Sequence, residues 1–286
     1  MTHRRVPAAA LVLALGACGG GAPEAPAPSE TPLAYSVPAT NPVTYASSDT
    51  ARINIHLAPG QVIEQTMGQT STVRLSFSPG AAGALSVAAN YTDFNAFMES
   101  SMMPRQDVGN DAFDGEFVLS LSPEGDVETV SGPELPEEVQ QMTMGGELFA
   151  DFFVRLPGRI AQPGETWTDT VRVDEETAGT HTVNETIVVS TFRGDTTVAG
   201  RTLWIIDATK TSTVVIEGDM QGMQMRNELS GSMAERTLWD PARRVMHSTR
   251  STGSMTGSVS IPAAGMTDIP LDVSNSRYVR LVESGT

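Results

Sequence analysis

Cys18 is the only cysteine in the 286-residue chain, and its thiol has the widest chemistry of any side chain in the sequence. It ends an apolar run from Val6 to Leu15 and precedes a glycine- and proline-rich stretch. A thiolate can attack a substrate, bind a metal or accept an acyl group. No second cysteine can pair with it in a disulfide, and no histidine pattern accompanies it. We therefore expect Cys18 to anchor the chain.

The N-terminus has the parts of a secretory signal: a positive start at residues 3–5, an apolar core and small residues at its end. The apolar run is shorter than the roughly 20 residues that a membrane-spanning helix needs. Its end, Leu15-Gly16-Ala17-Cys18, resembles the lipobox of bacterial lipoproteins. This resemblance implies a signal peptide at residues 1–17 and a mature protein that begins with a lipidated Cys18, carrying acyl chains such as palmitate.

The resemblance also implies a location in the cell envelope. Two or three acyl chains hold a protein on a membrane far more firmly than one chain does. In the enterobacterial lipoproteins that this region resembles, aspartate after the cysteine favours the inner membrane. Here Gly19 stands at that position. We therefore expect a lipid-anchored protein, at the outer membrane rather than the inner one, with the membrane as its partner through Cys18.

A tether follows the anchor. Residues 18–45 are rich in glycine, alanine and proline, a composition that buries too little apolar surface to fold and favours extended conformations. The remaining residues, 46–286, form a single domain whose sequence is rich in strand patterns. The sequence thus predicts three parts: a signal peptide, a tether and one β-rich domain.

The net charge of the chain argues against one class of partner. The chain carries 18 basic and 34 acidic residues, a formal net charge of −16. Such a chain repels the phosphate backbone of nucleic acids, so we expect no nucleic-acid partner. The sequence names no protein partner.

The domain shows no catalytic constellation. His56, His181 and His247 lie far apart in the sequence, and no nucleophile-elbow, zinc-protease, Walker or Rossmann pattern is present. Lys210 is the only lysine, and its context Thr209-Lys210-Thr211 reads as the outward face of a strand. We therefore predict no enzymatic activity, no metal site and no cofactor.

Methionine is the one over-represented side chain, with 14 copies. The spacing of Met220, Met223 and Met225 resembles the thioether clusters with which periplasmic copper proteins hold Cu(I), although Met220 would lie on the opposite face of a strand. Methionine also lines apolar cavities and fills cores. We favour core filling, with cavity lining second.

Along the domain, apolar and polar residues alternate with a period of two. Ile53, Ile55 and Leu57 alternate with polar residues, and similar runs cover about residues 165–174, 180–193, 196–217, 223–239, 243–260 and 269–283. Turn residues stand between the runs, at Ala58-Pro59-Gly60, Arg193-Gly194-Asp195, Glu217-Gly218-Asp219 and Asp240-Pro241 among others. Strands followed directly by turns indicate antiparallel pairing.

One segment departs from this pattern. From Leu135 to Leu156, apolar residues recur at helical spacing, Pro136 and two glutamates suit a helix start, and Gly145-Gly146 interrupts the run. We predict one broken helix that packs its phenylalanines on the concave side of a sheet. The expected fold class is mainly β (α+β): a large curved antiparallel sheet or open half-barrel with one broken covering helix.

Two stretches of the domain carry further resemblances. The segments LSPEGDV and FFVRLPGRIAQPGETWTDT resemble a group of uncharacterised bacterial lipoproteins, a likeness that implies no activity. Residues Arg236 to Val245, RTLWDPARRV, are similar to a strand-turn-strand of lipoprotein carriers of the Lol and mycobacterial lipid-carrier type. That similarity implies a half-barrel that holds acyl chains.

Two functional hypotheses follow. The first is a membrane-anchored protein that binds a lipid or another hydrophobic ligand between sheet and helix. The residues expected to line that cavity are Leu148, Phe149, Phe152, Phe153, Trp167, Met223 and Met225. The alternative is a structural or protein-interaction lipoprotein with a filled core and no small ligand.

Overall fold

The computed structural model describes residues 31–109, 115–135, 139, 148–177, 180–220 and 223–283. Cys18, the predicted signal peptide and the first part of the predicted tether lie outside these residues.

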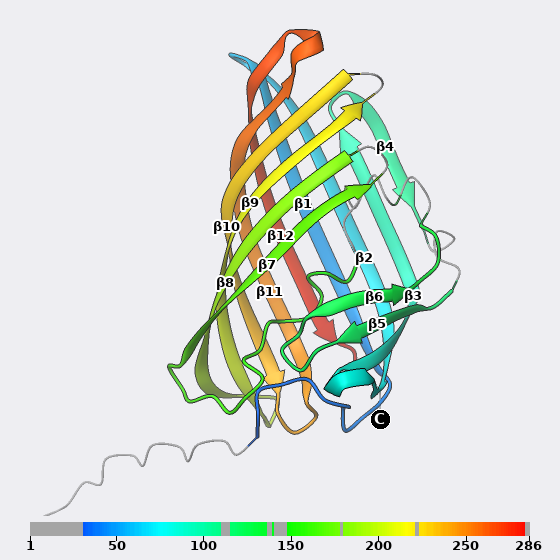
Figure 1. Cartoon of the computed structure of the whole chain (residues 1–286), viewed down its shortest axis with the longest axis vertical. Helices are drawn as coiled ribbons and strands as arrows, with labels where there is room; N and C mark the ends of the chain where they lie inside the picture. Colours follow the sequence, from blue (N-terminus) through cyan, green and yellow to red (C-terminus); the bar gives the residue numbers. More distant parts are fainter. Residues whose placement is uncertain are drawn as a thin grey trace, which may run out of the picture.

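The described chain forms one antiparallel sheet of twelve strands (Figure 1). In chain order they are β1 (Val43–Ala58), β2 (Gln61–Pro79), β3 (Leu85–Ser100), β4 (Met103–Val108), β5 (Phe117–Leu121), β6 (Val127–Ser131), β7 (Thr166–Thr177), β8 (Thr180–Val198), β9 (Arg201–Met220), β10 (Met223–Asp240), β11 (Val245–Ile261) and β12 (Met266–Leu281). Two short 3₁₀ turns, η1 (Ala81–Gly83) and η3 (Pro262–Ala264), lie between strands.

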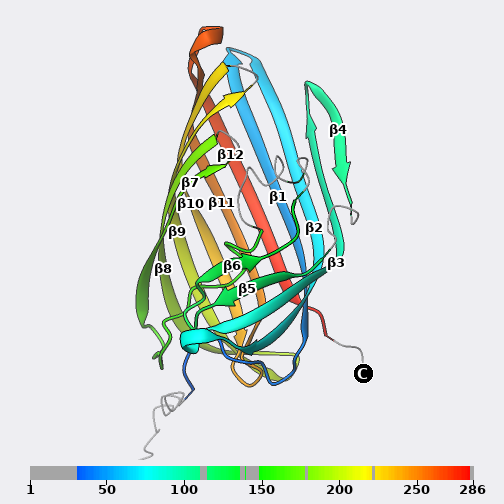
Figure 2. The same cartoon turned by 45° about the vertical axis from the view of Figure 1, so that its right-hand side comes forward.

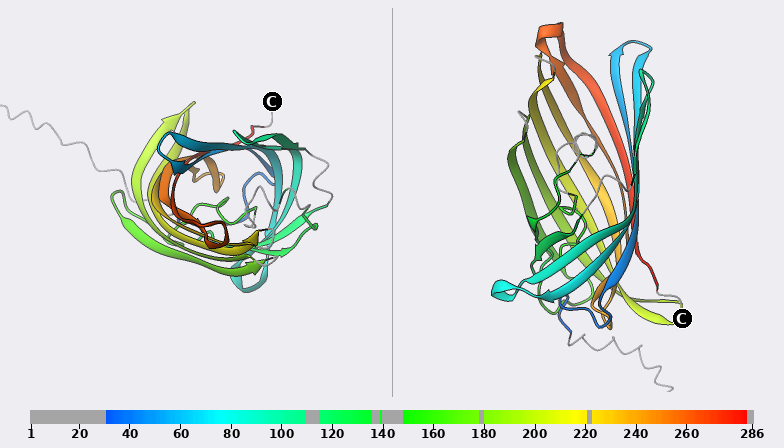
Figure 3. Two further views of the ribbon diagram at one scale, coloured as in Figure 1. Left: turned by 90° about the horizontal axis from the view of Figure 1, so that it is seen from above. Right: turned by 90° about the vertical axis from the view of Figure 1, so that its right-hand side faces the viewer.

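The spatial order is β6-β5-β3-β2-β1-β12-β11-β10-β9-β8-β7, with β4 paired to β3 beside this path. The sheet is strongly curved but does not close, since its path ends at β6 and β7 (Figure 3). We call the curved sheet the trough. Strands β3, β5 and β6 cross its open side at the lower end (Figure 2). The mainly β class, the antiparallel pairing and the curved open sheet are confirmed.

Some predicted turns are real and others are not. Gly60 adopts a φ of 80° between β1 and β2, and Asp240 ends β10, where its carboxylate accepts hydrogen bonds from the amides of Ala242 and Arg243. The turn expected at Gly194 is wrong, because β8 continues to Val198 with a bulge between Phe192 and Gly194. Likewise β9 runs through Gly218 to Met220. At Gly218 the neighbouring strands hold the backbone extended, whereas at Gly194 a β-bulge accommodates a φ of 101° without ending the strand.

The hydrophobic core fills the lower end of the trough, where β1 and β9 begin and β2, β10 and β12 end. Strands β1, β2, β3, β5 and β9 contribute alternate residues to it, as their half-buried sequence patterns predict. The largest fully buried side chains include Trp239, Phe149, Leu33, Leu75, Leu119, Leu121, Leu203 and Ile206.

The predicted covering helix is not found in the described part of the chain. Residues 136–138 and 140–147 lie outside that part, and from 148 to 153 the chain forms turns and a bend rather than a helix. A turn in which Phe152 donates its amide hydrogen to the Phe149 carbonyl, 3.0 Å away, suffices to bury the phenylalanines. Among the described residues, no helix has the length and apolarity to cross a membrane.

The folded part begins earlier than the sequence predicts. Leu33 and Tyr35 fall within the predicted tether, yet they are only 1% and 7% exposed. The amide of Leu33 donates to the Arg159 carbonyl at 2.9 Å, and the Tyr35 ring meets Phe153 and Trp239 edge to face. Two apolar side chains among prolines are enough to dock this segment, because the core offers them a site.

Candidate ligand-binding cavity

A row of polar side chains crosses the inner face of the sheet above the core. The register places Asp49 of β1 opposite Arg277 of β12, Arg277 opposite Ser251 of β11, and Ser251 opposite Glu235 of β10. Side chains directly opposite each other on antiparallel strands lie on the same face of the sheet. We call these four residues, together with Lys210 of β9, the polar belt.

The polar belt lines a cavity of about 390 Å³. Besides the belt, its wall includes Asp151, Asn275, Thr186 and Ser212, and the apolar side chains of Met67, Met233, Met255 and Val214. Thus eight strands, β3, β2, β1, β12, β11, β10, β9 and β8, and the segment around Asp151 contribute to one site. This volume lies in the range of about 300–1,000 Å³ that is usual for small-molecule sites.

Lys210 and Glu235 form the most buried ion pair of the belt. The ammonium nitrogen lies 3.0 Å from a carboxylate oxygen, and the two side chains are 13% and 7% exposed. The expectation that Lys210 faces outward is therefore wrong. The phase of β9 explains this, because Trp204, Ile206 and Ala208 are buried on the same side of the strand, whereas Thr209 and Thr211 are exposed.

Arg277 connects two acidic residues at the other end of the belt. Its Nε lies 3.3 Å from Asp49 Oδ1, an ion pair without hydrogen-bond alignment, and its NH1 donates to the Asp151 carbonyl at 3.2 Å. Burial raises the pKa of the Asp49 carboxyl, the Arg277 guanidinium opposes this, and the nearby Asp151 carboxylate adds to it. Burial and a neighbouring carboxylate thus disfavour further negative charge in this corner.

Above the polar belt, the inner face becomes aliphatic towards the strand ends farthest from the core. Val214 and Met255 lie on the cavity wall. The register places Leu271 opposite Ile55 and Gly257, and Val273 opposite Ile53 and Met255. These positions share the inner face because the side chains alternate along each strand. The cavity therefore joins a polar floor to an apolar strip.

The aromatic residues that the sequence nominated for the cavity lie in the core. Phe149, Phe152 and Phe153 are buried there, and the latter two line only a void of about 10 Å³. A void of this size holds about one water molecule at most. Leu148 and Trp167 are partly buried against the same core, where Trp167 Nε1 donates to the Arg155 carbonyl at 3.3 Å.

The two nominated methionines lie on β10. Met225 is half-buried opposite Gly218 of β9, and Met223 begins the strand with its side chain outside the described set. Met225 does not line the cavity, whose methionines among the described residues are Met67, Met233 and Met255. The sequence does contain a pattern that points to Met233 and Met255. Each stands two residues from a glycine, Gly231 or Gly253, and so shares one face of its strand with that glycine. This pattern shows which residues share a face, but only the pairing of the strands shows which face lines the cavity.

The histidines stand apart from the cavity. His56 contacts Asp272 at 2.8 Å and His181 contacts Asp174 at 2.9 Å, both on the surface. His247 is half-buried, and its Nδ1 has no hydrogen-bond partner. Within the described ranges, no three of the His, Cys, Asp and Glu side chains gather in a geometry that could hold a metal ion.

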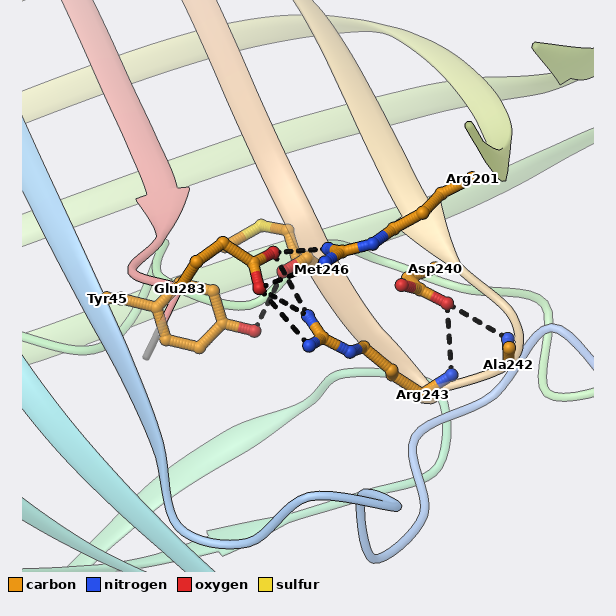
Figure 4. A network of polar contacts seen from close by, with 7 residues as sticks. All are labelled: Tyr45, Arg201, Asp240, Ala242, Arg243, Met246 and Glu283. Carbon is orange, nitrogen blue, oxygen red and sulfur yellow. Dashed lines mark hydrogen bonds and ion pairs between the residues drawn. The ribbon is translucent and has the colours of Figure 1, made fainter. Parts of the chain in front are cut away.

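A second polar network fastens the lower end of the sheet (Figure 4). Glu283, just after β12, accepts hydrogen bonds from Arg201 of β9 and from Arg243 in the turn between β10 and β11. Hydrogen bonding to Arg201, aided by Arg243, lowers the pKa of the Glu283 carboxyl. Nearby, the Tyr45 hydroxyl donates to the Met246 carbonyl at 2.9 Å. These contacts connect strands at the base of the trough and leave the cavity above them.

Comparison with known proteins adds little to this geometry. No protein-family model and no curated protein matches the sequence. Among solved structures, the chain is similar to DynF from the dynemicin biosynthesis pathway of Micromonospora chersina, with 8% sequence identity and a TM-score of 0.26 over 88% of this chain and 89% of that chain. A likeness at this level carries no argument about fold or function.

Proposed function

We propose that this protein binds a small amphipathic molecule in the cavity above its core. The observation that carries the proposal is the 390 Å³ cavity, whose wall combines methionines with a buried ion pair. The lower end of the same trough is filled by aromatic side chains, with a void of only about 10 Å³. The protein therefore packs one half of the trough closely and leaves space in the other half.

The chemistry of the wall supports a ligand with both apolar and polar parts. Methionine side chains are flexible and polarisable, so they adapt to ligands of varied shape. Convergent polar groups in an otherwise apolar site fix the orientation of a ligand. A lipid or another hydrophobic molecule with one polar end has this combination.

The lipobox at Leu15 to Cys18 complements this proposal. A lipidated Cys18 would hold the folded part at the envelope membrane, and the outer membrane is favoured by Gly19. In this arrangement the protein works next to a source of lipid-like molecules. The tether sets how far the cavity stands from the membrane surface.

Native mass spectrometry of residues 31–286 tests the proposal directly. The fragment starts at residue 31 because Leu33 and Tyr35 belong to the core. We expect a fraction of the purified protein to carry extra mass that organic extraction removes and identifies. A protein that is always free of ligand, and that takes up no added amphiphile, would favour the structural or interaction lipoprotein instead.

A pair of variants on β9 links any bound mass to the cavity. Ser212 lines the cavity, and the adjacent Thr213 is exposed on the outer face. The bulky indole of Ser212→Trp should occupy the cavity and abolish ligand uptake, whereas Thr213→Trp should bind as the wild type does. Equal uptake by both variants would place the ligand elsewhere on the protein.

A further inference from the structure

The cavity wall has an excess of negative charge. Its ionisable residues are Asp49, Asp151 and Glu235 against Lys210 and Arg277. Lys210 is paired with Glu235 and Arg277 with Asp49, so neither cation is free. Among the described residues, no ion pair neutralises the Asp151 carboxylate, although Arg277 contacts its backbone carbonyl. The surplus charge thus lies in the corner that Asp49 and Asp151 share.

One buried oxygen of the cavity wall also has no hydrogen-bond partner. It is Asn275 Oδ1 on β12, whose residue stands opposite Ala51 of β1 and Gly253 of β11. A buried acceptor without a donor is costly, and a ligand that supplies a donor removes that cost.

An anionic ligand fits this wall poorly. Arg277 and Lys210 already pair with Asp49 and Glu235, so a carboxylate or phosphate at either cation competes with a carboxylate of the protein. A cationic ligand needs no displacement, because Asp151 already offers an unpaired carboxylate beside Asp49. Asp151 is exposed and the Asp49 side chain is 32% exposed, so water screens part of the attraction between these carboxylates and a cation.

We propose that the preferred ligand is a single-chain amphiphile whose polar end is a protonated amine. The amine lies in the corner formed by Asp49, Asp151 and Asn275, and the chain runs along the aliphatic strip towards the strand ends away from the core. This inference rests on the proposed binding function and specifies its ligand class. It excludes free fatty acids as the preferred ligands.

The test compares three ligands of equal chain length. Dodecylamine, dodecanol and dodecanoate, each below its aggregation concentration at pH 7, are titrated calorimetrically into the full chain carrying Cys18→Ser, which prevents lipidation. We expect dodecylamine to bind at least about tenfold more tightly than dodecanoate, with dodecanol between them. The Ser212→Trp variant should bind none of the three.

Two variants locate the amine. Asp151→Asn should reduce the ratio of the affinities for dodecylamine and dodecanoate, since it removes the unpaired carboxylate and leaves the Asp49–Arg277 pair in place. Asp93→Asn makes the same change of charge at an exposed residue outside the cavity, so its preference should equal that of the wild type.

The outcomes separate the two proposals. If none of the three ligands binds, the binding function itself fails. If dodecanoate binds as tightly as dodecylamine, the function stands and the amine assignment is overturned. If Asp151→Asn keeps the full preference, the amine does not lie in the proposed corner.

Discussion

At the scale of single residues, the buried pair of Lys210 and Glu235 shows how a charge can persist inside a β-sheet. Each partner neutralises the other at 3.0 Å, and both side chains are largely removed from water. Desolvation offsets much of the attraction in such a pair, so the pair itself stabilises the fold little. Loss of one partner lowers stability strongly, because the other charge then remains buried without a counter-charge.

Removing Lys210 alone should therefore destabilise the protein by about 3–5 kcal/mol. Lys210→Met leaves Glu235 buried without its cation, whereas the double variant Lys210→Met with Glu235→Met replaces both charges by apolar groups. We expect the double variant to be close to the wild type or more stable. Urea denaturation followed by circular dichroism measures both. Equal losses for single and double variants would contradict this account.

Glu283 should make stability depend on pH. Its pKa is lowered in the folded state by Arg201 and Arg243, so its contribution is present above the unfolded value near 4.5 and is lost as the pH falls through the folded value. Glu283→Gln should cost about 0.5–1 kcal/mol at pH 7, since the pair is partly exposed, and nothing at pH 2. Glu128→Gln, at an exposed residue, serves as the control in urea titrations at both values.

At the scale of elements, glycines on the inner face allow the long strands to curve around the cavity. Gly231 of β10 and Gly253 and Gly257 of β11 lie beneath neighbouring backbone or methionine side chains. A Cβ at Gly231 would lie 2.1 Å from the Ser254 carbonyl oxygen, closer than any real contact. Glycine in a strand marks close backbone approach or sharp bending, and both occur here.

Gly231→Ala should thus cost about 1–3 kcal/mol, because the methyl group forces β10 and β11 apart. Gly109→Ala is the matched control, since a Cβ there meets no atom within 4 Å. Thermal unfolding compares the two. If Gly231→Ala unfolds at the same temperature as the control, the close approach of the strands does not constrain the sheet.

At the scale of the whole molecule, the fold begins before the predicted domain boundary at residue 46. The fold includes residues from about 31, where Leu33 and Tyr35 seal the base of the core. Tyr35 also accepts a hydrogen bond from the Val154 amide at 2.9 Å. The proposed tether after Cys18 therefore ends before Leu33 rather than near residue 45.

Truncation tests this boundary. Removal of residues 1–30 should leave the unfolding midpoint unchanged, whereas removal of residues 1–36 should cost about 3–5 kcal/mol because two buried side chains are lost from the core. Urea titration of the two fragments measures the difference. Equal stability of both fragments would mean that Leu33 and Tyr35 do not support the core.

Cys18→Ser tests the anchor. Without a thiol no acyl chain can be attached, so the variant should leave the membrane fraction of fractionated cells, in which we expect the wild type to be found. Ser101→Ala, on the exposed surface of the domain, controls for the effect of a substitution. A Cys18→Ser protein that still partitions entirely with membranes would rule out anchoring through this residue.

The sequence alone indicated most of the strands, their antiparallel direction and a curved open sheet, because alternation along a strand and the turn residues between strands are local properties. It also pointed to Cys18, whose neighbours in the chain carry the signal. Only the tertiary structure decided where Lys210 points and which residues meet in the cavity. Asp49 and Arg277 are separated by most of the chain and adjoin only through the β1–β12 register. Such contacts depend on the pairing of whole strands, which no local pattern specifies.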